Sequence, residues 1–239
     1  MRGLPMVSIE VENFAVISYP VAAERIEAHL PSVYELDTMQ TSIGRTGFVS
    51  TTCFCNHAFR LARIKYPRHT FNESTYRTYV NYKGRHGIYF FGRYLGTRLA
   101  WLAQRPLARD TFVGDFAVKS EIRNGAYDYM SCRVTSRHGD TSFLLEGDDG
   151  RDASLDSDLD LEQFLTYRLH GFFTAPLGLQ GHMPVNHPRM RPFRGRLSDG
   201  RFDLWTELGI LDDSEITSPA SVLIAPRVPF TLYAPRPIV

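Results

Sequence analysis

Hydrophobic and polar residues alternate in short stretches along most of the chain, and this period of two is typical of β-strands. The first stretch ends at Pro20, whose ring removes a ladder donor. Two hairpins follow later, one over residues 115–136 that turns at Asn124-Gly125, where positive φ angles are needed, and one that turns at residues 138–140. We expect the earlier strands over residues 7–19, 43–55, 58–66, 71–82 and 87–95.

Helical spacing is confined to a few short segments. Residues 21–30 form an amphipathic stretch that Pro31 closes, and a second helix is expected in the first part of residues 97–108. Residues 147–160 are acidic and polar and predict a loop, after which Asp158 caps a short helix that reaches Leu165.

Many strands with two or three short helices indicate an α+β, mainly β fold with a barrel architecture. Neither half of the chain has a self-sufficient core pattern, and β barrels of this length form single units. We therefore expect one domain over residues 1–239.

Composition and charge narrow the function classes. The net charge of +1 gives no field that would attract nucleic acid or an anionic membrane, so we expect neither as a partner. Three cysteines, Cys53, Cys55 and Cys132, show no framework spacing, and the N-terminus lacks the apolar core of a signal peptide. These features favour the cytoplasm, and the sequence leaves a homo-oligomer open.

Residues 71–80 (FNESTYRTYV) carry the most informative polar pattern. In a strand, Glu73, Thr75, Arg77 and Tyr79 share one face. A carboxylate, a guanidinium and a phenol are costly to bury unless they satisfy one another or a ligand. An ion pair on an exposed face and a polar pocket wall are both compatible with this pattern.

The same stretch carries a family resemblance. Together with Gly87-Ile88-Tyr89-Phe90-Phe91 it resembles the F-x-E-x-x-x-R-T-Y-V … G-V-Y-F-F signature of the YqjF-like family, a domain of unknown function in the acetoacetate decarboxylase-like superfamily. Weaker matches follow the same order as in that family. They are Leu30-Pro31 with Leu36-Asp37-Thr38, Leu165-Thr166-Tyr167-Arg168, and Gly181-His182-Met183-Pro184.

The resemblance implies a twisted, cone-like β barrel with an enclosed pocket. In the decarboxylase itself, a pocket lysine forms a Schiff base with a β-keto acid and a glutamate assists; Glu73 is the expected counterpart of that glutamate. The lysine segment maps near Pro106-Leu107-Ala108-Arg109, which contains no lysine. Lys119, on the next strand, could reach the interior or lie in solvent. Tyr167 and Val185 stand where the family commonly has glutamate and tryptophan.

Other candidate sites rest on weaker patterns. Cys53, Cys55 and His57 share a strand face, but a four-coordinate zinc site needs further ligands, and we assign no metal and no cofactor. His182 and His187 lie in a proline-rich stretch, where either could cap a loop or line a pocket, and the resemblance favours His182.

The expected function is that of a small-molecule enzyme that acts on an oxo acid or a related carbonyl or carboxylate compound, without a lysine Schiff base. Glu73 would act as acid or base and Arg77 would hold the ligand's carboxylate or enolate. Tyr79, Tyr89, His182 and Lys119 are the remaining ligand-binding candidates. Lyase, isomerase and cyclase chemistry stay open. The alternatives are a non-catalytic binding barrel and a structural interaction protein with a collapsed interior. If Glu73 and Arg77 are both buried, we expect their stability contributions to depend on one another.

Overall fold

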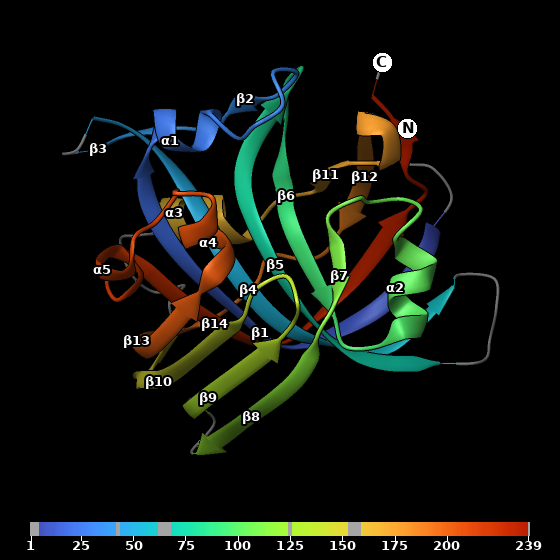
Figure 1. Cartoon of the computed structure of the whole chain (residues 1–239). Coiled ribbons are helices and arrows are strands. Elements are labelled where there is room, and N and C mark those ends of the chain that lie inside the picture. The colour runs from blue at the N-terminus through green and yellow to red at the C-terminus, as the bar shows by residue number, and fades with distance from the viewer. Residues whose placement is uncertain (1–4, 42–43, 62–67, 124–125, 153–158, 239) are drawn as a thin grey trace.

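A single mixed sheet dominates the computed structural model, which describes residues 5–41, 44–61, 68–123, 126–152 and 159–238 (Figure 1). The strands are β1 (Pro5–Ala22), β2 (Glu35–Leu36), β3 (Met39–Thr41), β4 (Gly44–Leu61), β5 (His69–Tyr82), β6 (Arg85–Leu95), β7 (Thr111–Val113), β8 (Asp115–Arg123), β9 (Ala126–Thr135), β10 (Thr141–Asp152), β11 (His170–Thr174), β12 (Gln180–Asn186), β13 (Phe193–Phe202), β14 (Ser221–Tyr233) and β15 (Arg236–Pro237).

Seven of these strands close into a barrel-like ring. Hydrogen-bonded pairs run from β1 through β4, β5, β6, β11 and β12 to β14, and β14 pairs with β1 again. The closure between β6 and β11 is parallel and close, because a Cβ on Gly87 would lie 2.4 Å from the carbonyl oxygen of His170. This contact explains why glycine stands at the start of the Gly-Ile-Tyr-Phe-Phe segment.

Strands β13, β10, β9 and β8 continue the sheet beyond β14 and form the lower left of Figure 1. They pack on the outer faces of β1, β4 and β5, where the largest hydrophobic core contains Tyr76, Met130 and Trp205, each 0% exposed. Cys53 on β4 and Cys132 on β9 meet in this core with their Sγ atoms 3.0 Å apart. The main core therefore lies outside the ring, and the ring interior is not filled by this core.

The described residues include five short α-helices, more than the two or three we expected. They are α1 (Ala23–Glu27), α2 (Arg98–Gln104), α3 (Leu159–Thr166), α4 (Asp203–Glu207) and α5 (Asp213–Ile216), with a 3-10 turn at Pro176–Gly178. Thr97 caps α2, and Asp212 forms a capping box with Glu215 at α5. The Asp-x-x-Glu spacing at residues 212–215 was the available sequence signal for α5.

Several predicted boundaries are wrong for identifiable reasons. Strand β1 continues past Pro20 to Ala22, because beyond Ser18 it pairs only with β4 and the proline faces no partner on its other side. The expected break between residues 55 and 58 is a bulge within β4, with Ala58 at φ 52°. Strand β10 extends into the expected acidic loop, to Asp152. The turn at Asn124-Gly125 and the cap at Asp158 lie outside the described residues.

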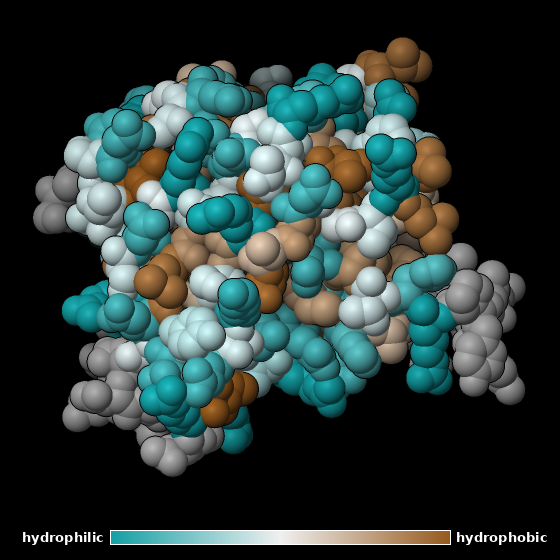
Figure 2. All heavy atoms as spheres, turned by 60° about the horizontal axis from the view of Figure 1, so that its bottom comes forward, coloured by the Kyte–Doolittle hydropathy of each residue, from teal (hydrophilic) through white to brown (hydrophobic). Residues whose placement is uncertain are grey.

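Polar residues cover most of the face shown in Figure 2, and hydrophobic residues appear there as separate patches. No helix in the described part of the chain is both long and apolar enough to cross a membrane.

Candidate functional site

The interior of the strand ring holds a cavity of about 100 Å³. Every strand of the ring contributes to its wall, and the end of α3 closes one side with Leu165 and Thr166. The wall is mostly apolar, with Phe14, Phe54 and Phe230 among its rings, so the few polar groups that reach it are conspicuous. A mostly apolar cavity with a few converging polar groups is the usual form of a small-molecule site.

Strand β5 presents Glu73, Thr75 and Arg77 to this cavity, as the period-two pattern predicts. The opposite face of the strand carries Tyr76 into the main core. Glu73 and Arg77 are 6% and 7% exposed and line the cavity, as the pocket-wall interpretation of the pattern expects. A pair of solvent-exposed charges is thereby excluded.

The carboxylate of Glu73 is held by residues other than Arg77. Arg93 donates to Oε1 from Nε at 3.0 Å and from Nη2 at 2.7 Å, and Asn56 donates to Oε2 at 2.9 Å. The Nη2 group of Arg93 also donates to Gln104 at 2.6 Å. No ion pair joins Glu73 to Arg77, since the partner of Glu73 is Arg93, so these contacts do not support the expected mutual dependence, which stays a prediction.

A β-bulge explains why the alternation of the sequence does not reveal Arg93. In β6, Phe90 pairs with Arg77 but Gly92 pairs with Tyr76, so Phe91 is the extra residue. Ile88 and Phe90 face the cavity, and the bulge shifts the parity so that Arg93 faces it too. Strict alternation would have placed Arg93 on the opposite face.

Arg77 is the unusual charge of the site. Its only hydrogen bond to the described residues runs from Nη2 to the carbonyl oxygen of Leu165, at 3.2 Å, and its buried Nε has no partner. None of the carboxylates in the described part of the chain lies within 4.0 Å of it. The guanidinium instead lies 5.7 Å from the ring centre of Phe14 and 5.9 Å from that of Tyr79. A buried cation without a counterion is destabilising unless a ligand supplies one.

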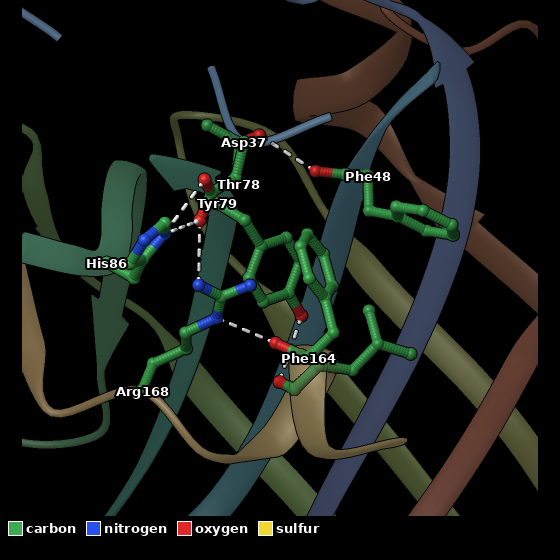
Figure 3. A network of polar contacts seen from close by, with 8 residues as sticks. Asp37, Phe48, Thr78, Tyr79, His86, Phe164 and Arg168 are labelled. Atoms are coloured by element: carbon green, nitrogen blue, oxygen red, sulfur yellow. Dashed lines mark hydrogen bonds and ion pairs between the residues drawn. The ribbon is translucent and has the colours of Figure 1, made fainter. Parts of the chain in front are cut away.

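A second cavity-lining arginine, Arg168, has a carboxylate counterion and a backbone acceptor (Figure 3). Its Nη1 donates to Asp37 at 2.7 Å and its Nε donates to the carbonyl oxygen of Phe164 at 2.7 Å. The guanidinium lies 4.1 Å from the centre of the Phe164 ring. His86, an exposed residue of the β5–β6 hairpin, approaches the same carboxylate at 2.9 Å. Burial lowers the pKa of Arg168, and the charge of Asp37 opposes that effect.

This ion pair joins two of the sequence motifs. Asp37 comes from the Leu-Asp-Thr segment and Arg168 from the Leu-Thr-Tyr-Arg segment, 131 residues apart. The backbone N–H of Asp37 donates to the carbonyl oxygen of Tyr79 on β5, at 2.9 Å. The motifs therefore meet beside the cavity and fix the position of Arg168.

Tyr79, which we expected to face the cavity with Glu73 and Arg77, is not among the residues that line it and is bound by protein groups. Its hydroxyl group is 2.7 Å from that of Ser50 and donates to the carbonyl oxygen of Leu165 at 3.1 Å. It is 0% exposed and packs on Phe48. Its contacts are those of a residue that supports the end of α3.

Of the two histidine candidates, His187 lines the cavity and His182 does not. Met183 and Val185 of β12 line the cavity, so His182 lies on the opposite face, stacked on Phe172 at 5.1 Å. Burial and nearby positive charges lower its pKa to about 4. Its Nε2 is 2.8 Å from Nδ1 of His170, which does line the cavity. His187, which the family resemblance did not favour, also reaches the cavity wall, and burial lowers its pKa.

Tyr89 and Lys119 lie away from the cavity. Tyr89 is on the outer face of β6, where its hydroxyl group is 2.8 Å from that of Thr174 and burial raises its pKa. Lys119 is exposed on β8, the end strand of the sheet extension, because the extension packs outside the ring. Lys83 is exposed at a hairpin, and Lys65 lies outside the described residues.

Residues 106–109, where the order of segments along the chain led us to expect the decarboxylase's reactive lysine, reach a second, neighbouring cavity. Leu107 and Ala108 line it with apolar side chains. Arg109 is exposed and pairs with Asp110 at 3.0 Å. None of these residues offers an amine for a Schiff base.

Within the described ranges, no three His, Cys, Asp or Glu side chains cluster closely enough to hold a metal ion. Cys53 is buried against Cys132, whereas His57 is exposed and lies 4.0 Å from Glu12. The residues of the Cys53–His57 segment therefore do not converge on one point.

The fold is that of the acetoacetate decarboxylase-like proteins. An acetoacetate decarboxylase from Legionella pneumophila superposes with a TM-score of 0.65 at 15% identity, over 98% of this chain and 87% of that one. The enduracididine biosynthesis enzyme MppR, complexed with pyruvate, gives 0.63 at 13% identity over 98% and 90%. An acetoacetate decarboxylase-like enzyme from Sphingomonas wittichii gives 0.64 at 9% identity over 98% and 94%. At these identities the likeness establishes the fold alone.

The chain belongs to the DUF2071 family, described as an uncharacterized conserved protein, whose model matches residues 8–229. Uncharacterized protein YqjF of Bacillus subtilis (strain 168) is 38% identical over 122 residues. That match covers 50% of this chain and 48% of YqjF, about half the length of each.

Proposed function

We propose that this protein is an enzyme that binds a small oxo acid inside the strand ring and moves a proton on the carbon next to its carbonyl, without a lysine Schiff base. Arg77 carries the proposal. It is a buried guanidinium with an unpartnered Nε, no acidic neighbour among the described residues, and a place in a cavity wall. A carboxylate that accepts from two of its N–H groups would supply the missing counterion.

The net charge of the wall supports a ligand with one negative charge. Arg93 is neutralised by Glu73, and Arg168 by Asp37, which leaves the charge of Arg77 unbalanced. Burial lowers the pKa of His187, so this neighbour is neutral at pH 7 and adds no second unpaired cation. A dianionic ligand would exceed the charge that the wall offers.

The opposite end of the cavity suits a carbonyl group. Glu73 lies four residues from Arg77 along the strand, roughly 13 Å between Cα atoms, so that a small acid fits between the two side chains. Glu73 accepts three hydrogen bonds, and a carboxylate has about four acceptor sites, which leaves one for a substrate proton. In the proposed step, Glu73 takes a proton from the carbon, the C–H electron pair forms the enolate, and reprotonation restores the oxo acid. The guanidinium of Arg93, beside Glu73, would stabilise the enolate oxygen.

The fold neighbours support an oxo acid as ligand, because one of them, MppR, was solved with pyruvate. The apolar Leu107 and Ala108, in the segment where chain order led us to expect the lysine, support a mechanism that forms no imine. Reduction with borohydride in the presence of pyruvate should therefore leave the protein mass unchanged. A stable adduct, on any lysine, would contradict this part of the proposal.

The direct test is proton exchange followed by NMR. Pyruvate and 2-oxobutanoate in D2O should lose their C3 proton signals when the protein is added. Glu73→Gln should abolish the exchange and retain binding, whereas Arg77→Met should abolish binding. Glu35→Gln and Arg133→Met change exposed residues of the same types and serve as matched controls. Exchange that survives Glu73→Gln would remove Glu73 from the mechanism.

A second candidate function, ligand binding without turnover, is favoured by one observation. Both oxygens of Glu73 already accept hydrogen bonds from protein donors, as in a structural ion pair. In that case pyruvate would bind in an Arg77-dependent manner and its C3 protons would not exchange.

A further inference from the structure

A second cavity, of about 70 Å³, lies against the first. Aromatic and aliphatic side chains form most of its wall, including Phe59 and Phe71, whose ring centres are 5.6 Å apart, and Phe173. Leu107 and Ala108 close it on the side of the segment that follows α2. Among the described residues that line it, the Glu73–Arg93 pair, which it shares with the first cavity, supplies the only charges.

The two cavities share one partition. Its polar part consists of Asn56, Glu73 and Arg93, and its apolar part of Ile9, Met183 and Leu232. The polar groups are satisfied by one another and by Gln104, so the partition offers no unpaired charge to the second cavity. Polarity therefore changes in one direction, from the unpaired cation at Arg77, through the hydrogen-bonded partition, to an apolar chamber.

We infer that the ligand is an oxo acid with an extended apolar substituent, an alkyl chain of several carbons or an aryl ring, which occupies the second cavity. This inference rests on the proposed function, since it keeps the carboxylate at Arg77 and the carbonyl group at the partition. An apolar chain crosses beside Ile9, Met183 and Leu232 and leaves the ion pair intact. Met183 is unbranched and flexible, so its side chain can repack around a chain at low cost.

The size of the chambers supports the same ligand class. Pyruvate bound between Arg77 and Glu73 would leave the apolar second chamber without a contact. A longer substituent buries its surface against the phenylalanine rings, and each methylene group that is buried should tighten binding about fourfold. The gain ends where the second chamber is full.

The test is calorimetric titration of the intact protein with pyruvate, 2-oxobutanoate, 2-oxohexanoate and 2-oxooctanoate. We expect the affinity to rise about fourfold per methylene group over at least three groups. Ala108→Leu, which fills the second chamber, should lower the ratio of the 2-oxooctanoate affinity to the pyruvate affinity at least tenfold. Ala117→Leu, on the exposed face of β8, should keep the wild-type ratio. Phe173→Leu, which enlarges the chamber, should extend the gain to longer chains and replaces Ala108→Leu if that variant does not fold.

An affinity series that is flat beyond pyruvate would overturn this inference and leave the proposed function standing. Unchanged ratios in both chamber variants would also overturn it. Failure of every acid to bind the wild-type protein would overturn the proposed function and this inference with it.

Discussion

Arg77 and Arg168 are two buried arginines in the wall of one cavity, and their surroundings differ in nearly every respect. Arg168 has an aspartate, a backbone carbonyl and an aromatic ring as partners, whereas Arg77 has one carbonyl at 3.2 Å and an unpartnered Nε. Removing one partner of a satisfied buried pair leaves an uncompensated charge, but removing an unpaired charge takes away a cost. The contrast predicts a structural role for Arg168 and supports the ligand-binding role proposed for Arg77.

The largest expected effect is on the Asp37–Arg168 pair. Asp37→Ala leaves the Arg168 guanidinium buried without its counterion, so the free energy of unfolding should fall by about 3–5 kcal/mol. Urea denaturation followed by circular dichroism measures this change. His86→Gln is the control, because it removes only the exposed contact to the same carboxylate and should cost less than ~0.5 kcal/mol. A near-neutral Asp37→Ala would mean that Arg168 does not depend on Asp37.

The second effect concerns the partner of Glu73. Glu73→Gln and Arg93→Met should each lower the free energy of unfolding by about 3 kcal/mol, and the double variant should cost much less than the sum. The same cycle between Glu73 and Arg77 should give a coupling below ~0.5 kcal/mol, because no contact joins the two side chains. Strong coupling to Arg77 would restore the pairing that the sequence suggested.

Much of the fold and part of the site were predictable from the sequence. The alternation along residues 71–80 places Glu73 and Arg77 in the cavity, and the family signature indicates the ring that encloses it. Local patterns do not predict the face of a residue that follows a β-bulge, or the side of the ring on which a strand packs. The bulge at Phe91 brings Arg93 to Glu73, and the outward packing of the β8 extension takes Lys119 away from the ring.

The long-range contacts of the site were beyond local pattern analysis for a different reason. Asp37 and Arg168 each belong to a recognisable motif. Neither motif indicates that the two residues, 131 positions apart, form an ion pair. His182 was misplaced because the family resemblance gives a position along the chain but not the face of β12 on which the ring lies. The face of β12 that carries Met183 and Val185 is known to be the inner one only once β11 and β14 are known to be its neighbours in the ring.

The third expected effect is that of His182 on how the free energy of unfolding depends on pH. Its pKa in the folded protein is about 4, against 6.5 for an unperturbed histidine. Between these values the unfolded chain binds a proton that the folded chain does not, so the free energy of unfolding falls as the pH falls. His182→Gln should remove about 2 kcal/mol of the loss that the wild-type protein shows between pH 6 and 4.5. His29→Gln, an exposed control, should leave the pH dependence unchanged.

The smallest expected effect on stability is the one that tests the comparison most directly. Arg77→Met should change the free energy of unfolding by no more than about 1 kcal/mol, in either direction. The variant loses a hydrogen bond to the carbonyl of Leu165 but also removes an unpaired buried charge, and a methionine thioether packs well on the rings of Phe14 and Tyr79. Thermal unfolding with and without pyruvate measures both roles of the residue. The wild-type protein should be stabilised by pyruvate and the variant should not respond to it, whereas Arg168→Met should lose about 3–5 kcal/mol even without ligand. If Arg77→Met lost as much stability as Arg168→Met, Arg77 would be a structural cation like its neighbour, and the assignment of the cavity to a carboxylate ligand would lose its main support.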